Sequence, residues 1–401
     1  MNTQSFIELE EKYGAHNYHP LDIVIQRAEG IWVYDVEGEK YLDFLSAYSA
    51  VNQGHCHPDI LNALIEQAKS VPLTSRAFRN DQLGKFYQEL TEMCEMEMVL
   101  PMNSGAEAVE TAIKAARKWG YQKKGIPEGK AEIIVCENNF AGRTTTIVGF
   151  SSDDQYKDGF GPFTPGFKII PYNDIAALEA AITENTVAFL AEPIQGEGGI
   201  LIPDAGYLEN ACKICSEKNV LTIWDEIQSG LGRSGKLFAY QHENNAKPDL
   251  LTIGKALSGG FYPVSAVVGK RDVLGVFNPG DHGSTFGGNP LACAIAREAL
   301  NVIKKEGLVQ KSAELGAYFM ERLATIESKH IQEIRGKGLF IGVELNKEAG
   351  GARRFCEALM DEKLLCKETH ENVIRFAPPL VIQKEEIDWA FYRIKKVLET
   401  L

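Results

Sequence analysis

A carboxylate and an amine follow two apolar runs of the chain that lie thirty residues apart. Asp225 follows the run 220–224, and Lys255 follows the run 250–254. Both runs predict buried strands of a parallel sheet, and the carboxyl ends of such strands open onto one crevice. A lysine that can form an imine with an aldehyde, facing an acid that can keep a ring nitrogen protonated, indicates pyridoxal phosphate (PLP) chemistry.

The residues around Lys255 favour a reactive amine. Gly254 and the pair Gly259-Gly260 let the backbone approach a ligand closely, and the preceding apolar strand would desolvate the amine and lower its pKa. A lysine after a strand is usually only a solvated strand end, so the context carries the prediction. Gln228, three residues after Asp225, could hydrogen-bond the phenolic oxygen of the cofactor.

The segment Asn103-Ser-Gly-Ala-Glu-Ala-Val109 could hold a phosphate. Ser104 is a typical N-cap residue and Glu107 stands three positions later, so a capping box is expected to start a helix that runs through Arg117. The free N–H groups at a helix start bind phosphate. Many helices begin this way without a ligand. The segment therefore indicates a phosphate site only in combination with Lys255 and Asp225.

A third loop, Asn138 to Thr144, follows the predicted strand 132–136. Phe140 could stack on a planar ring, and Gly142 would let Arg143 turn into the crevice. The alternative is a core phenylalanine beside a surface arginine. Glu192 and the residues after it end the next strand and place acids at the same rim.

The elements that must position these residues predict an α/β fold. From about residue 54 to residue 288, short apolar strands alternate with helices, as in a mostly parallel sheet sandwiched by helices. The clearest strands are 132–136, 186–191, 220–224 and 250–253.

The two ends of the chain predict a smaller α+β domain. Residues 30–38 and 40–45 have strand character around a Glu-Gly turn, which is typical of an antiparallel ribbon. The last part gives a long helix over 289–305 and strands over 338–344 and 373–376. We therefore expect residues 1–53 and 289–401 to form the small domain and residues 54–288 to form the large PLP-binding domain.

Composition excludes several other classes of function. The 401 residues are 44% hydrophobic, and 42 basic against 55 acidic residues give a net charge of −13, which argues against nucleic acid or an anionic membrane as a partner. No apolar run approaches the ~20 residues of a membrane helix. The acidic start of the chain resembles no leader, so a cytoplasmic protein is expected.

Cysteine and histidine usage predicts no metal site. Of eight cysteines, Cys212 and Cys215 form a C-x-x-C motif within an amphipathic helical pattern, which favours burial over zinc binding or redox chemistry. His55-Cys56-His57 is adjacent in sequence, but neighbouring residues of an extended segment point in alternating directions.

Taken together, the motifs resemble those of a known family along nearly the whole chain. The matching segments are Asn103-Ser-Gly-Ala-Glu-Ala, Trp224-Asp-Glu-Ile-Gln, Thr252-Ile-Gly-Lys-Ala-Leu-Ser-Gly-Gly, His282-Gly-Ser-Thr-Phe-Gly-Gly-Asn-Pro and Ile374-Arg-Phe-Ala-Pro-Pro. The chain resembles the class III, fold type I PLP-dependent aminotransferases. Tyr18, Tyr48 and Glu197 make it most similar to the ornithine δ-aminotransferase branch.

The resemblance implies a homodimer with shared active sites. The same resemblance implies that Lys255 holds PLP as an imine and that Asp225 pairs with the ring nitrogen. The other residues implied to bind the cofactor are Ser104, Gly105 and Ala106 at the phosphate, Phe140 on the ring, Gln228 at the phenolic oxygen, and Thr285 of the partner subunit at the phosphate.

The resemblance also implies two small-molecule substrates, L-ornithine and 2-oxoglutarate. Arg375 would bind the α-carboxylate of 2-oxoglutarate and Arg143 its distal carboxylate. When ornithine binds, Glu197 would pair with Arg375 and mask it, while Tyr18 and Arg143 hold the α-carboxylate of the amino acid. Tyr48 would line the pocket.

Several alternatives remain open at this stage. Ala141 is small where a larger aromatic is expected in some members of the family, so a wider pocket could accept longer diamines or N-acetylated substrates. Acetylornithine or 4-aminobutyrate aminotransfer, an aminomutase and a cofactor-free binding protein are the rival functions. The sequence leaves open whether the reaction serves arginine catabolism or proline biosynthesis, and whether dimers assemble further.

Overall fold

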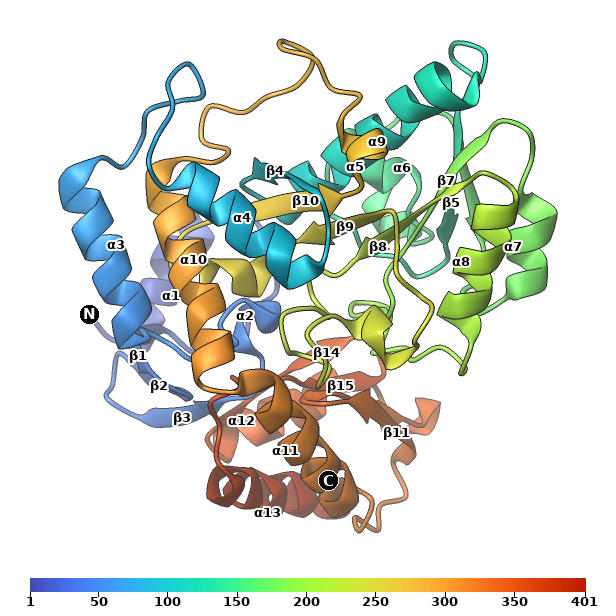
Figure 1. Cartoon of the computed structure of the whole chain (residues 1–401). Helices are drawn as coiled ribbons and strands as arrows, with labels where there is room; N and C mark the ends of the chain where they lie inside the picture. The colour runs from blue at the N-terminus through green and yellow to red at the C-terminus, as the bar shows by residue number, and fades with distance from the viewer.

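The structure, a computed structural model, describes residues 1–401 and is built around a seven-stranded sheet (Figure 1). Strand β10 is antiparallel to both of its neighbours, and the other pairs are parallel. The mostly parallel sheet predicted from the sequence is therefore confirmed. In spatial order the strands are β4 (Met98–Met102), β10 (Ser265–Gly269), β9 (Leu250–Ile253), β8 (Leu221–Asp225), β7 (Thr186–Ala191), β5 (Glu132–Cys136) and β6 (Phe167–Ile170).

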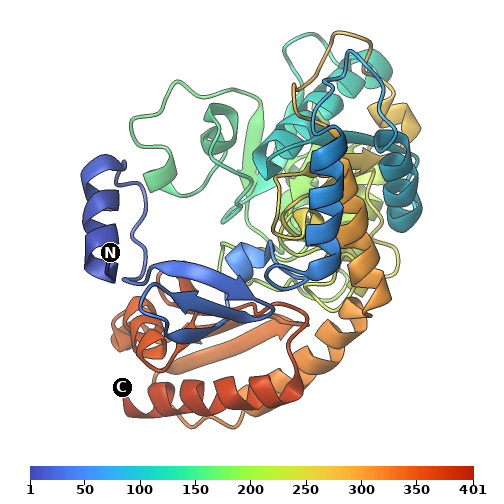
Figure 2. The ribbon, with the colours of Figure 1, turned by 90° about the vertical axis from the view of Figure 1, so that its left-hand side faces the viewer.

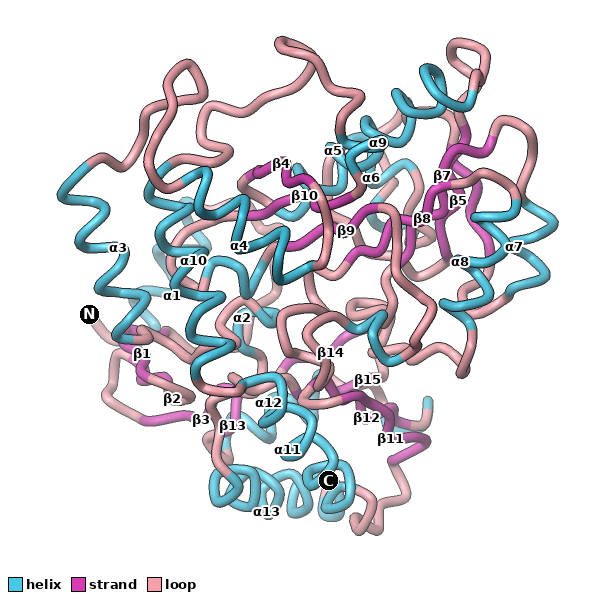
Figure 3. Tube along the Cα trace, viewed as in Figure 1, coloured by secondary structure: helices cyan, strands magenta, loops and turns pink.

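Helices cover both faces of this sheet because its central strands are apolar on both sides (Figure 3). Leu221 and Ile223 of β8 pack with the α5 side of the core, and Trp224 packs with the opposite side. The helix α5 (Gly105–Trp119), extended by a π-helical turn, lies on the first face. The helices on the other face include α4 (Leu83–Cys94), α8 (Tyr207–Glu217) and α10 (Pro290–Lys305).

Two smaller sheets of four strands each lie below the central sheet in Figure 1. The first has the order β1 (Ile25–Glu29), β2 (Trp32–Asp35), β3 (Lys40–Asp43) and β13 (Leu364–Leu365). The second has the order β11 (Ile331–Lys337), β12 (Phe340–Leu345), β15 (Val373–Phe376) and β14 (Lys367–Thr369). The helices that accompany them are α11 (Leu308–Leu323), α12 (Arg353–Asp361) and α13 (Lys384–Thr400).

The first small sheet joins the two ends of the chain. Strand β13 pairs in parallel with β3, with Leu364 opposite Leu42, and Figure 2 shows the blue ribbon lying against the red C-terminal elements. This pairing supports the proposed division into residues 1–53 and 289–401 on one side and 54–288 on the other, which stays a prediction.

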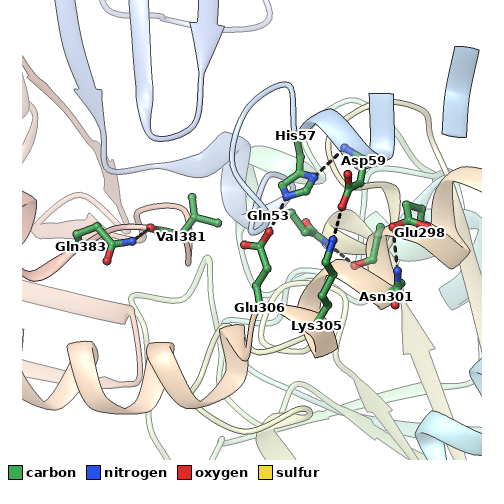
Figure 4. Close-up of polar contacts among 10 residues, drawn as sticks. Gln53, His57, Asp59, Glu298, Asn301, Lys305, Glu306, Val381 and Gln383 are labelled. Atoms are coloured by element: carbon green, nitrogen blue, oxygen red, sulfur yellow. Dashed lines mark hydrogen bonds and ion pairs between the residues drawn. The ribbon is translucent and has the colours of Figure 1, made fainter. Parts of the chain in front are cut away.

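Polar contacts join the start of α3 (Pro58–Ser70) to the end of α10 (Figure 4). His57 Nε2 lies 2.9 Å from Glu306 Oε1, and Lys305 Nζ donates to Asp59 Oδ2 at 2.8 Å. His55 instead contacts Asp43 Oδ2 at 2.7 Å. The two histidines thus serve different structural contacts.

Four predicted strands have the observed bounds, namely β5, β7, β9 and β15. The predicted strand 220–224 is shifted by one residue, because β8 begins at Leu221 and ends on Asp225 itself. The helix predicted over 289–305 is α10, which starts one residue later, at Pro290, with Asn289 as its N-cap. The remaining short helices are α1 (Thr3–Tyr13), α2 (Ser46–Ser49), α6 (Thr145–Gly149), α7 (Ile175–Ala181) and α9 (Arg271–Leu274). None of the helices combines the length and apolar character that a bilayer crossing requires.

The C-x-x-C motif lies within α8, as expected. Cys215 is buried against the core and Cys212 is half-buried, and both thiols are free. Burial raises the pKa of Cys212 to about 12, which keeps that thiol protonated.

Candidate active site

Asp225 and Lys255 meet at the carboxyl edge of the central sheet. Asp225 is the last residue of β8, and Lys255 follows β9 after Gly254. Both line a cavity of about 190 Å³. Its other lining residues are Gly105, Ala106, Phe140, Ala141, Gly142, Glu192, Glu197, Ile227 and Gln228. Most of the side chains predicted from the sequence to contact the cofactor are therefore brought together.

The amine of Lys255 sits on a strained turn. The residue has a φ of +44°, a left-handed conformation that is unfavourable for a side chain with a Cβ. Gln53 braces this turn by donating from Nε2 to the carbonyl of Ala256 at 2.9 Å. Burial lowers the pKa of Lys255, and the carboxylates of Glu197 and Asp225 offset this only in part. The turn thus presents a nucleophilic amine to the cavity.

The buried carboxylate of Asp225 has one free oxygen. Oδ1 accepts hydrogen bonds from the N–H of Ile227 at 3.1 Å and from Thr252 Oγ1 at 2.9 Å. Burial raises the pKa of Asp225 to about 6 despite these donors. A protonated nitrogen facing the other oxygen, Oδ2, would stabilise the ionised carboxylate and so offset the cost of burying it.

The cost of burying Asp225 gives a pH-dependent prediction for the cofactor-free protein. Below the ordinary pKa of 3.8 the side chain is protonated in both the folded and unfolded states, and as the pH rises through about 6 the folded state must ionise a buried acid. Asp225→Asn should therefore be more stable than the parent by about 3 kcal/mol at pH 8, with a difference that shrinks towards pH 4. Urea unfolding at several pH values measures this, and a difference independent of pH would contradict it.

The start of α5 carries the predicted capping box. Ser104 Oγ accepts from the N–H of Glu107 at 3.2 Å, and Glu107 Oε2 accepts from the N–H of Ser104 at 2.7 Å. The N–H groups of Gly105 and Ala106 donate to no group of the chain, and both residues line the cavity. They can hold an anion. Ser104, whose hydroxyl serves the cap, does not line the cavity.

The side chain of Glu192 holds the loop that carries Phe140 in place. The Glu192 carboxylate accepts from the N–H of Phe140 at 2.9 Å and from the N–H of Gly196 at 3.1 Å. Burial, and secondarily Asp225, raises the pKa of Glu192 to about 8. At Gly142, with φ +128°, an added Cβ would lie 2.7 Å from Ala106 Cβ, so this glycine lets the loop pack on α5. Phe140 is thereby held at the cavity wall.

Arg375 and Glu197 form an ion pair beside the cavity. Arg375, on β15, is 1% exposed, and its Nη1 donates to Glu197 Oε1 at 2.6 Å. Gln228 Nε2 donates to the same oxygen at 3.1 Å. Burial would raise the pKa of Glu197, but Arg375 and Lys255 outweigh it and hold this pKa at about 2. Glu197 is therefore ionised, while Arg375 Nε and Nη2 and Gln228 Oε1 remain without partners.

Tyr48 approaches Arg375 from a left-handed turn. The guanidinium carbon lies 4.8 Å from the ring centroid of Tyr48. The four residues of α2 have φ values of +52°, +46°, +60° and +72° although none is a glycine. Asp43 Oδ1 braces this turn by accepting from the N–H of Ser46 at 2.9 Å, and Ser46 Oγ donates to the carbonyl of Ala377 at 2.7 Å. Such maintained strain is typical of functional sites.

Tyr18 and Thr285 lie on exposed loops outside the cavity. Tyr18 is 78% exposed, and its loop is held by Arg353, which donates to the carbonyls of His19 at 2.9 Å and Pro20 at 2.7 Å. Thr285 is exposed on a loop that Asn103 ties to α5 through Ser284. The action of Thr285 in a partner subunit stays a prediction.

Two contributors to the site were missed in the sequence. Thr369 Oγ1 donates to the carbonyl of Glu197 at 2.7 Å and fixes its backbone. Tyr156 stacks on Arg143, with 3.5 Å between the guanidinium carbon and the ring centroid. Both residues come from segments without a motif, so only the tertiary structure identifies them.

The polar groups of the cavity fit PLP. An amine, an unpaired carboxylate oxygen and two free helix N–H groups match its aldehyde, ring nitrogen and phosphate, and the orphaned Gln228 Oε1 can accept a hydrogen bond from its phenolic hydroxyl. Gly196 leaves room for the Gln228 amide in this position, because an added Cβ would lie 1.7 Å from Gln228 Oε1.

Known proteins resemble this chain along its whole length. Residues 13–398 match the family model of class-III aminotransferases. An ornithine aminotransferase of Brevibacillus brevis is 62% identical, with 99% of this chain and 98% of the relative covered, and one of Halalkalibacterium halodurans is 61% identical, with 99% of each covered.

Solved structures agree in fold. The ornithine aminotransferase of Toxoplasma gondii superimposes with a TM-score of 0.98 at 46% identity, covering 99% of this chain and 95% of that one, and another structure of it is described with PLP at partial occupancy in the active site. The acetylornithine aminotransferase of Elizabethkingia anophelis gives 0.90 at 50% identity, with 99% of each chain covered. A cavity suited to PLP, on a chain this similar to aminotransferases from end to end, makes the protein a member of the class-III aminotransferases, which are PLP-dependent transaminases.

Proposed function

We propose that the chain is an ornithine δ-aminotransferase, which moves the δ-amino group of L-ornithine to 2-oxoglutarate and yields glutamate 5-semialdehyde and glutamate. The observation that carries this proposal is the Arg375–Glu197 pair, 2.6 Å apart beside the amine of Lys255. A transaminase that must expose a terminal amine to its cofactor, and later an α-carboxylate, needs a cationic site that can be covered and uncovered.

PLP, when bound, supplies an electron sink for the carbanion left when a proton departs from the substrate carbon. Lys255 would hold the cofactor, then take the proton from Cδ of ornithine and deliver it within the cavity. Its lowered pKa suits both tasks. Asp225 would keep the ring nitrogen protonated through Oδ2, while Gly105 and Ala106 would bind the phosphate with their free N–H groups.

The two arginines would bind the substrates in turn. With ornithine, Glu197 covers Arg375, and Arg143 and Tyr18 hold the α-carboxylate away from the reacting carbon. With 2-oxoglutarate, Arg375 binds the α-carboxylate and Arg143 the distal one. The pairing of Glu197 with Arg375 is the arrangement expected for the amino-donor state.

Further parts of the proposal have indirect support. The relatives named ornithine aminotransferase cover the whole chain at about 60% identity. Thr285, exposed and outside the cavity of its own chain, is available to a second subunit in the proposed homodimer. A cytoplasmic location stays a prediction.

A comparison of amino donors tests the proposal. We expect L-ornithine to change the absorbance spectrum of the purified holoenzyme faster than N-acetylornithine or 4-aminobutyrate does. The product of the ornithine reaction should cyclise to pyrroline-5-carboxylate. Steady-state rates should depend on 2-oxoglutarate with parallel double-reciprocal lines. An enzyme that turns over ornithine without 2-oxoglutarate would instead be an aminomutase.

Acetylornithine aminotransfer is the second candidate. It is favoured by the small Ala141 at the cavity wall, and a protein of that name is 50% identical over 99% of the chain. If N-acetylornithine reacts faster than ornithine, the roles given to Tyr18 and Glu197 are wrong.

A further inference from the structure

The guanidinium of Arg143 lies over an aromatic ring from another loop. Its central carbon is 3.5 Å from the ring centroid of Tyr156 and 5.6 Å from that of Phe140. The two rings meet edge to face, with 6.3 Å between their centroids and an interplanar angle of 83°. Tyr156 thus joins the cavity wall at Phe140 to the arginine.

The loops that carry Arg143 and Tyr156 are tied together at their base. Asn139 Nδ2 donates to the carbonyl of Phe150 at 3.0 Å, and the N–H of Asn138 donates to Ser152 Oγ at 2.7 Å. Asp153 then caps the short helical turn that ends on Tyr156, with Oδ1 accepting from the N–H of Gln155 at 2.9 Å. The ring of Tyr156 is therefore placed by the same unit that places Arg143.

The contrast with Arg375 shows what an aromatic partner provides. Arg375 is covered by the carboxylate of Glu197, which neutralises it. Arg143 forms no ion pair within the chain and is oriented by a neutral ring. Burial raises the pKa of Tyr156, only partly offset by Arg143, so the phenol stays neutral. A ring holds the face of a guanidinium and leaves its N–H edge and full charge available to a carboxylate.

We propose that Tyr156 is a positioning residue of the transaminase: its ring holds Arg143 ready to receive the carboxylate far from the reacting carbon, and so sets the preference for dicarboxylic oxo acids. This inference rests on the proposed function, in which Arg143 binds the distal carboxylate of 2-oxoglutarate. We expect the face of the ring, and not the hydroxyl, to hold the guanidinium.

Three variants of the holoenzyme test this role. Tyr156→Leu removes the ring, Tyr156→Phe keeps the ring without the hydroxyl, and Phe160→Leu removes a 62% exposed ring from the same loop as a matched control. Each is assayed with ornithine and either 2-oxoglutarate or pyruvate, which lacks the distal carboxylate. Binding of glutarate, an unreactive dicarboxylate, is measured by calorimetry.

We expect Tyr156→Leu to raise the KM for 2-oxoglutarate and to weaken glutarate binding about tenfold, because a cation–π contact of this kind is worth about that factor. The kcat, and kcat/KM for pyruvate, should stay within about twofold, as should all values for Tyr156→Phe and Phe160→Leu.

Equal losses with 2-oxoglutarate and pyruvate would overturn the role, as would a Tyr156→Phe variant as impaired as Tyr156→Leu. Glutarate affinity unchanged in Tyr156→Leu would overturn it as well. Failure of the proposed function has a different signature, because the parent enzyme itself would then not couple ornithine to 2-oxoglutarate.

Discussion

Lys255→Ala should lower turnover of ornithine by about a thousandfold or more, because the variant loses both the amine that holds the cofactor and the group that moves the proton. The fold should be retained. The lysine sits at φ +44° in a buried site that lowers its pKa, so its removal takes away a desolvated cation and leaves no partner that depends on it alone.

The measurement is a pair of experiments on the same preparations. Steady-state assays give the activity, and reduction with borohydride followed by mass spectrometry shows whether PLP becomes fixed to the chain. Lys270→Ala is the matched control, since Lys270 is an exposed lysine paired with Asp249 at 2.6 Å outside the cavity. Normal turnover in Lys255→Ala, or fixation of PLP to another lysine in the active parent, would refute the assignment.

Glu197→Gln should change which amine reacts. The carboxylate that holds Arg375 at 2.6 Å is lost, and a buried arginine without its counterion attracts any incoming α-carboxylate. We expect kcat/KM for the half-reaction with glutamate to rise about ten- to a hundredfold and that for ornithine to fall. The ratio of the two rates, measured by single-turnover absorbance, is the readout.

Glu344→Gln is the matched control for this experiment. Glu344 pairs with Arg335 on the neighbouring strand β11, so its replacement also removes a partly buried ion pair from the small sheets, but outside the cavity. It should alter stability without altering the choice of amine. Unchanged selectivity in Glu197→Gln would remove the masking role of Glu197.

The parts of the site that the sequence predicts are those coded by neighbouring residues. Strand ends place Asp225 and Lys255, and a capping box of Ser104 and Glu107 begins α5, because strand burial and helix capping depend on local patterns. The same holds for Arg375 on β15, whose apolar neighbours predict the strand.

Contacts between distant segments could not be read in this way. Tyr156 reaches Arg143 from a polar loop, and the turn that carries Tyr48 is left-handed without a single glycine to signal it. Strands β4, β6 and β10 were also missed, and β4 contains Pro101, a residue that argues against a strand inside a sheet. Glu192 was placed at the rim, but its two backbone contacts depend on a fold already formed.

The pairing of β3 with β13 has a consequence for the order in which the chain can fold. Leu42 must find Leu364, so the edge of β3 stays unpaired until almost the entire polypeptide has been synthesised. At the usual speed of translation this delay is roughly 15–60 s. During that time the central sheet, complete by residue 269, can form first, while the early ribbon waits with an exposed edge. During synthesis the N-terminal ribbon is therefore the part of the chain whose unpaired strand edge is most open to pairing with other chains.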